Sequence, residues 1–192
     1  MIYIEKCDSI DKFNEVSDQS IVLLKENGFF VKKQLDFTAF PFEESDHFSV
    51  SEIEEILLLT ENLSKKVFGG IFNSEFSLLE KFTGILDKEA LTFLNENYRS
   101  SKIYFCNENL DFLFFLSGIE YGVLFTKKRL GENFFKKSLD QIINDFYRLT
   151  LGWPDNWNMS FLDTILKNTK IYNNESEENF VNFLPVKVIK LT

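Results

Sequence analysis

Histidine and cysteine, the residues that nucleophilic and zinc chemistry most often use, are scarce in this chain of 192 residues. Because His47 is the only histidine, a metal site with two or three histidine ligands cannot form within one chain. Cys106 follows Tyr104 and Phe105 in a segment that predicts a strand, so we expect a buried, inert thiol rather than a nucleophile activated by His47. Cys7 and Cys106 are too few for a disulfide framework, and we expect free buried thiols, with one bridge between them as the alternative. We therefore assign no catalytic residue, no metal ligand and no cofactor.

Carboxylates are the abundant reactive groups, and their distribution along the chain is uneven. The sequence has 30 Asp and Glu against 21 Lys and Arg, which gives a formal net charge of −9. Residues 1–64 carry 14 acids and 5 bases, whereas residues 65–192 carry 16 of each, so the whole excess lies in the first third. Between Gln34 and Ser64, eight acidic residues occur without a single base. This balance argues against nucleic-acid binding, which needs clustered Lys and Arg, and predicts an acidic surface that attracts a basic protein.

Part of this acidic third also predicts a contact surface. With about 100° between successive residues, the aliphatic side chains of a helix over residues 52–68 fall mostly on one face, which we assign to the core. Leu58 falls instead among Glu54, Glu55 and Glu61, and an apolar side chain within a charged rim is typical of a protein–protein interface. We predict a partner-binding surface made by Glu43, Glu44, Asp46, Glu54, Glu55, Leu58 and Glu61.

Two alternatives leave these residues without a partner. Bases from elsewhere, such as Lys127, Lys128 and Arg129, would fold over the acidic residues and neutralise them. Leu58 would pack under residues 38–50, which contain Pro41 and several polar residues and therefore predict a loop.

The elements that must position these side chains predict one α+β domain over residues 1–192, a mainly antiparallel sheet of about five strands with helices packed on it. Ser51 and Glu54 fit a capping box, Gly69-Gly70 is expected to end the helix that begins there, and Asp87 is the expected N-cap of a later helix. Strands are predicted at residues 2–5, 29–37, 103–106, 111–116, 119–126 and 186–191. Helices are predicted at residues 9–26, with a break near Asp18 as the alternative, and at residues 52–68, 74–83, 88–97, 133–150 and 161–168.

In size, charge and lack of catalytic motifs, the chain is similar in class to the small acidic proteins of bacteria that neutralise toxins. We therefore hypothesise a non-catalytic inhibitor of the immunity type, which occupies the cleft of a basic, nuclease-like toxin or effector in place of phosphate. The alternatives are a phage-encoded decoy of a host nucleic-acid-binding protein, an enzyme of unrecognised type that uses carboxylates, and a structural subunit that binds a second copy. The sequence shows no signal peptide, and its longest apolar run is far shorter than the roughly 20 residues of a membrane span, so we expect a cytoplasmic protein.

Overall fold

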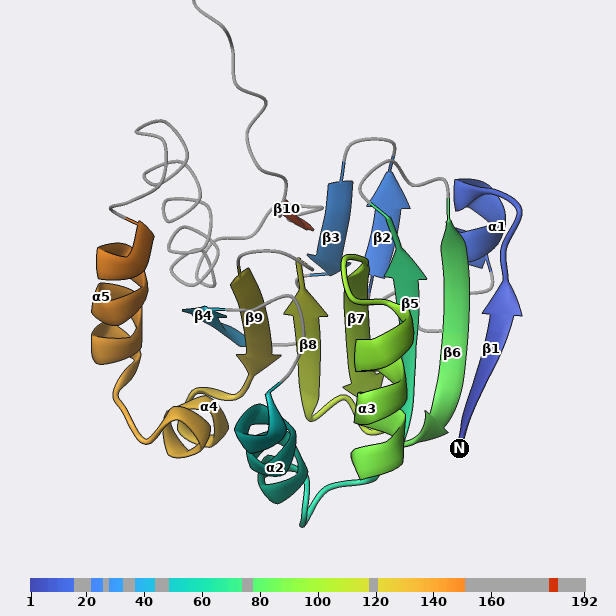
Figure 1. Ribbon diagram of the computed structural model, residues 1–192. Coiled ribbons are helices and arrows are strands. Elements are labelled where there is room, and N and C mark those ends of the chain that lie inside the picture. The colour runs from blue at the N-terminus through green and yellow to red at the C-terminus, as the bar shows by residue number, and fades with distance from the viewer. Residues whose placement is uncertain are drawn as a thin grey trace, which may run out of the picture.

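Residues 1–15, 22–25, 28–32, 37–43, 49–73, 78–117, 121–150 and 180–182 are described by the computed structural model of the chain. Within them, helices occur singly or as a pair between groups of strands (Figure 1). The strands are β1 (Ile2–Lys6), β2 (Val22–Lys25), β3 (Gly28–Lys32), β4 (Thr38–Glu43), β5 (Lys66–Phe72), β6 (Leu79–Ile85), β7 (Lys102–Asn107), β8 (Phe112–Leu116), β9 (Tyr121–Thr126) and β10 (Phe180–Asn182). The helices are α1 (Ile10–Glu15), α2 (Val50–Leu59), α3 (Lys88–Asn97), α4 (Lys128–Phe135) and α5 (Leu139–Thr150).

Seven strands form one sheet in the order β1-β6-β5-β7-β8-β9-β4, and β10, β3 and β2 form a second sheet. Every strand pair in both sheets is antiparallel. The predicted α+β class and antiparallel sheet are therefore confirmed, although the sheet has more strands than expected. The additional strands β4, β5 and β6 lie in segments that the sequence predicts to be loop or helix.

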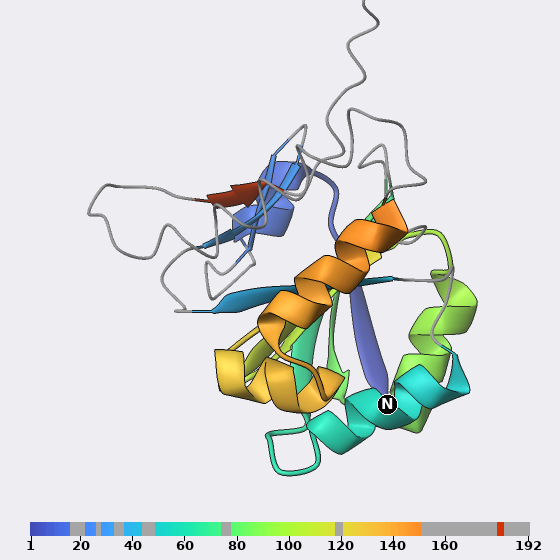
Figure 2. The same cartoon turned by 90° about the vertical axis from the view of Figure 1, so that its left-hand side faces the viewer.

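β8 has the sequence FLFFL and is buried on both faces, as its unbroken apolar run predicts. On one face, which we call the helix face, Phe114 stacks on Phe105 of β7 with ring centroids 5.1 Å apart. Helices α2 and α3 cover this face, whereas α1 and the second sheet lie on the other side (Figures 1 and 2). On the opposite face, Leu113 and Phe115 belong to a second buried cluster, to which α1 contributes Phe13. The large sheet therefore has a core on each side.

β4 forms one edge of the large sheet, and α5 crosses over that edge (Figure 2). Ile142 of α5 belongs to the core on the helix face, whereas Phe146, about one turn later, belongs to the core on the opposite face. The helix therefore covers the open edge of β4 and joins the two cores. Pro41 is accommodated in β4 because an edge strand has one side without a ladder partner. The loop predicted at residues 38–50 is thus wrong over residues 38–43.

The helix predicted at residues 52–68 is wrong in its second half, which forms β5. Gly69 and Gly70 do not end a helix but pair with β6 and β7 in the interior of the sheet. The carbonyl of Tyr104 and the ring of Phe82 occupy the space that a Cβ on Gly69 would need. Close approach of neighbouring groups, and not a helix end, therefore requires glycine here.

Three further helix predictions are corrected in part. The segment 9–26 contains α1 and then β2, and the segment 74–83 leads into β6, whose pairing with β1 and β5 outweighs its local helical spacing. Residues 133–150 belong to two helices, α4 and α5, rather than one. Lys136 separates them because its φ of 52° lies in the left-handed region, which ends α4.

The remaining predicted elements stand as follows. β1, β7, β8 and β9 confirm the strands predicted there, and β3 confirms the first part of the strand at 29–37. α3 begins after Asp87 as predicted, and the Asp87 carboxylate accepts a hydrogen bond of 2.7 Å from the backbone N–H of Ala90. The helix predicted at 161–168 and the strand at 186–191 lie outside the described residues.

Cys7 and Cys106 are free and buried, as expected. None of the described helices combines the length and the apolar composition that a membrane crossing requires.

Candidate functional site

Helix α2 is fixed at its start by a capping box that differs from the predicted one. The Ser49 hydroxyl accepts a hydrogen bond of 3.2 Å from the backbone N–H of Glu52, and the Ser49 N–H donates one of 2.6 Å to the Glu52 carboxylate. The cap therefore lies two residues before the predicted pair of Ser51 and Glu54. As a result, Glu54 is a residue of the helix body and is exposed.

The outward side of α2 combines apolar and acidic side chains. Ile53 and Ile56 are buried on the helix face of the sheet, which confirms the predicted core side of this helix. On the other side, Val50 and Leu58 are each 64% exposed, and both lie one helical turn from Glu54. The exposure of Leu58 argues against the alternative in which it packs under residues 38–50, of which 44–48 lie outside the described residues. We call the exposed surface of α2 and of the turn after it the α2 stripe; its members are Val50, Glu54, Glu55, Leu58 and Glu61.

The carboxylates of the α2 stripe carry no neutralising base in the described part of the chain. No described Lys or Arg nitrogen lies within 4.0 Å of Glu54, Glu55 or Glu61. Lys128, at the start of α4, pairs instead with Glu132 of its own helix at 3.9 Å. Lys127 and Arg129, the neighbours of Lys128, are exposed. The alternative in which these bases fold over the acidic residues is thus not found among the described ion pairs.

The structure distributes the predicted partner-binding residues over two elements. Glu54, Glu55 and Leu58 lie on α2, and Glu61 lies in the turn after the C-cap Thr60, whereas Glu43 is the last residue of β4. Glu44 and Asp46 lie outside the described residues. Val50 is absent from the predicted partner-binding residues. Ser51 and Glu54 also fit a capping box, and a helix capped at Ser51 would leave Val50 outside it. The pattern Ser49-x-x-Glu52, which places Val50 inside the helix, was the signal that could have found it.

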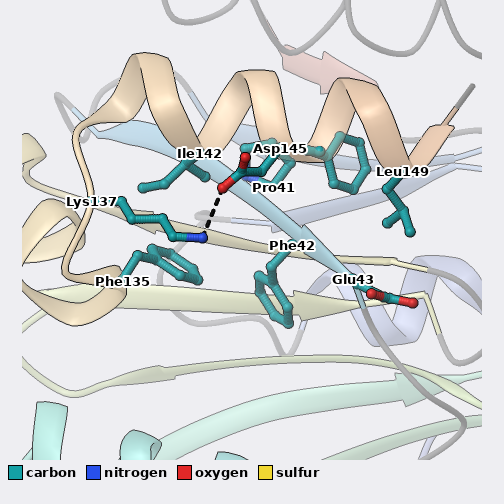
Figure 3. Close-up of a pocket in the computed structure, with 9 residues that line it drawn as sticks. Pro41, Phe42, Glu43, Phe135, Lys137, Ile142, Asp145 and Leu149 are labelled. Carbon is teal, nitrogen blue, oxygen red and sulfur yellow. Dashed lines mark hydrogen bonds and ion pairs between the residues drawn. The ribbon is translucent and has the colours of Figure 1, made fainter.

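Glu43 stands at a groove between β4 and α5, which we call the β4–α5 groove. Its volume is about 210 Å³, below the roughly 300–1,000 Å³ of most small-molecule sites, so the enzyme alternative gains no support from it. Lys137 reaches across one end of the groove to Asp145, while Glu43 and Leu149 lie at the other end (Figure 3). The hydrogen bond and charge of Lys137, at 2.7 Å, hold the pKa of Asp145 below its ordinary value. The lining residues are Pro41, Phe42, Glu43, Phe135, Lys137, Ile142, Asp145, Phe146 and Leu149.

One buried carboxylate lies elsewhere, where β6 meets the end of α3. Glu80 is 4% exposed, and its Oε1 lies 4.0 Å from Lys6 Nζ. Burial, and then the hydrogen bond with Glu80, raise the pKa of Tyr98 to about 12. Since Tyr98 is the C-cap of α3, this contact ties the end of the helix to the sheet and is structural.

Metal binding and thiol chemistry find no support among the described residues. These residues contain no group of three or more His, Cys, Asp and Glu that could hold a metal ion. Burial raises the pKa of the Cys106 thiol, which leaves it protonated and unreactive, as predicted for an inert cysteine. His47 lies outside the described residues, so the pair of Cys106 and His47 is not described.

Comparison of the chain with protein-family models, with curated proteins and with solved structures gives no match. Because a fold alone does not define a function, the function must be argued from the surfaces described above.

Proposed function

We propose that this chain is a non-catalytic binding protein that inhibits a basic partner, and that it is an immunity-type protein against a basic, nuclease-like toxin or effector. The observation that carries the proposal is the α2 stripe. It presents three carboxylates without a described base within 4.0 Å, around an apolar side chain that is 64% exposed.

Each part of the stripe has a physical role in this proposal. The carboxylates attract clustered Lys and Arg over a distance of about 10 Å at moderate salt, which raises the association rate and selects basic partners. Lys and Arg that hold phosphate in a nuclease would bind these carboxylates instead, so the bound inhibitor excludes the nucleic acid. Val50 and Leu58 supply the apolar contact that exposed charge pairs alone do not give.

The test measures binding to the product of the gene directly beside that of this chain, which the proposal expects to be basic, by calorimetry at several salt concentrations. One variant reverses the charges of the stripe with Glu54→Lys, Glu55→Lys and Glu61→Lys. The matched control reverses three exposed glutamates elsewhere with Glu5→Lys, Glu89→Lys and Glu96→Lys. Both variants change the formal net charge equally, from −9 to −3.

We expect the stripe variant to raise the Kd by about 10- to 100-fold and to flatten its salt dependence, because each exposed charge pair contributes about 0.2–1 kcal/mol. The control should change the Kd much less. Equal effects of the two variants would assign the binding to net charge and remove the α2 stripe from the mechanism. Lack of any complex with the neighbouring gene product would overturn the immunity function.

A further inference from the structure

The β4–α5 groove is a second candidate contact surface, and of the predicted partner-binding residues its lining contains Glu43. Its walls are apolar and come from separate elements, with Phe42 of β4 and Phe135 of α4 on one side and Leu149 of α5 on the other. The rings of Phe42 and Phe135 lie 5.9 Å apart, and each side chain is half-buried, so each leaves part of its surface open. The groove therefore exposes apolar side-chain surface that another molecule can contact.

The size of the groove suits a single side chain. A cavity of about 150 Å³ accepts benzene, whereas pockets for drug-sized molecules measure about 300–1,000 Å³. At about 210 Å³, the groove has room for one aromatic ring or one branched aliphatic side chain. A residue presented by another protein fits this volume better than a metabolite or a cofactor does.

The charges around the groove are not balanced. Lys137 and Asp145 are 2.7 Å apart and neutralise each other at one end. Glu43 is exposed at the other end, and no described Lys or Arg nitrogen lies within 4.0 Å of it. The uncompensated charge of the lining is thus the negative charge of Glu43, next to an apolar wall.

We propose that the β4–α5 groove receives one apolar side chain of a basic protein partner, while Glu43 pairs with a Lys or Arg adjacent to it in the partner. The occupant is therefore an apolar residue followed by a base. This inference rests on the proposed function, because the basic character of the partner is taken from it. It adds a contact point on β4 to the one proposed on α2.

The groove is tested without the partner, with capped dipeptides as probes in two-dimensional NMR titrations of the full chain. The probes are N-acetyl-Phe-Arg-amide, N-acetyl-Phe-Glu-amide and N-acetyl-Ala-Arg-amide. We expect N-acetyl-Phe-Arg-amide to bind with a millimolar Kd and to shift the amides of Phe42, Glu43 and Leu149. It should bind about threefold to tenfold more tightly than N-acetyl-Phe-Glu-amide, because one exposed charge is attracted in the first probe and repelled in the second. N-acetyl-Ala-Arg-amide should show no saturable binding.

Two matched variants assign the preference to Glu43. Glu43→Gln keeps the shape of an exposed side chain, so it should fold normally and bind the Arg and Glu probes equally. Glu54→Gln makes the same change on α2 and should leave the preference intact. Equal binding of both probes by the unmodified chain, or shifts confined to other surfaces, would overturn the inference. Charge reversal on α2 tests the proposed function independently, so failure of one idea is distinguishable from failure of the other.

Discussion

Adding a single methyl group at Gly69 tests whether close packing inside the large sheet requires glycine. Gly69 lies in β5, opposite Phe105 of β7, and a Cβ at this position would overlap the carbonyl of Tyr104 and the ring of Phe82. The Tyr104 carbonyl belongs to the backbone of β7, which has strands on both sides. It therefore cannot move without displacing the hydrogen-bonded ladder.

Gly84→Ala in β6 is the matched control. A Cβ on Gly84 would lie 2.7 Å from the carbonyl oxygen of Met1 and 3.1 Å from the Cα of Ile2, which are also too close. Met1, however, is 96% exposed and precedes the edge strand β1, so this part of the chain can shift. Both substitutions replace glycine by alanine in a paired strand, and they differ in how far the crowded backbone can move.

The expected magnitudes follow from the cost of overpacking, which is about 1–3 kcal/mol. We expect Gly69→Ala to lower the free energy of unfolding by about 2–3 kcal/mol and Gly84→Ala by less than about 1 kcal/mol. In a chain of this size, 1 kcal/mol corresponds to about 2–4 °C in Tm, so the two variants should differ by about 4–8 °C.

Urea unfolding and thermal unfolding, both followed by far-ultraviolet circular dichroism, measure these differences. The urea m-value should stay the same in both variants, since the surface exposed on unfolding is unchanged. If both variants unfolded at the same midpoint, or if Gly69→Ala were more stable than the unmodified chain, the assignment of crowding at Gly69 would be wrong.

Three further predictions concern the cap of α2, the buried tyrosine and the buried thiol. Ser49→Ala should lower the free energy of urea unfolding by about 1 kcal/mol, and Ser51→Ala much less, because only Ser49 caps α2; equal losses would contradict this cap. In a spectrophotometric titration, Tyr98 should deprotonate near pH 12, since burial, and then the hydrogen bond with Glu80, raise its pKa to about 12 from 10.0. The unfolded chain loses this proton first, so the contribution of Tyr98 to stability is present below pH 10 and lost between about pH 10 and pH 12; Glu80→Gln should lower the titration point. Burial raises the pKa of the Cys106 thiol, so a disulfide reagent should label it only after unfolding, and rapid labelling of the native protein would argue against its burial.

The parts of the fold that the sequence predicts correctly are those in which a local pattern and the tertiary contacts agree. β8 is apolar on both faces, and a strand of this kind has to be covered on both sides. α3 has an acidic N-cap followed by a clear apolar side, and both features act within a few residues. The same holds for the buried side of α2, where a spacing of about 100° per residue suffices to separate core from surface.

The parts predicted wrongly depend on residues distant in the sequence. β5 continues the apolar spacing of α2, and only the rings and backbone of other strands around Gly69 show that it belongs to a sheet. β4 contains Pro41, which argues for a loop unless the strand lies at an edge, and edge position is a property of the whole sheet.

The candidate site shows the same division. The exposed position of Glu54, Glu55 and Leu58 on α2 follows from local spacing, whereas Glu61 lies beyond the end of the helix, which the predicted helix over residues 52–68 does not anticipate. The separation of Glu43 from them could not be predicted, because it depends on the pairing of residues 38–43 with residues 121–126 and on the position of α5. The β4–α5 groove has no counterpart in any local pattern for the same reason.

The pairing of β4 with β9 also has a consequence for the order in which the protein can form during synthesis. Residues 38–43 leave the ribosome early, but their strand partner, residues 121–126, follows only after most of the large sheet has been made. Contacts between such distant segments form slowly, because a long loop has to close before the contact stabilises it. α2 is translated long before α4 and α5, so the α2 stripe exists as sequence well before the groove beside Glu43 can be completed. A ribosome-bound chain would therefore contain the α2 stripe first and complete the β4–α5 groove only when α5 has been synthesised.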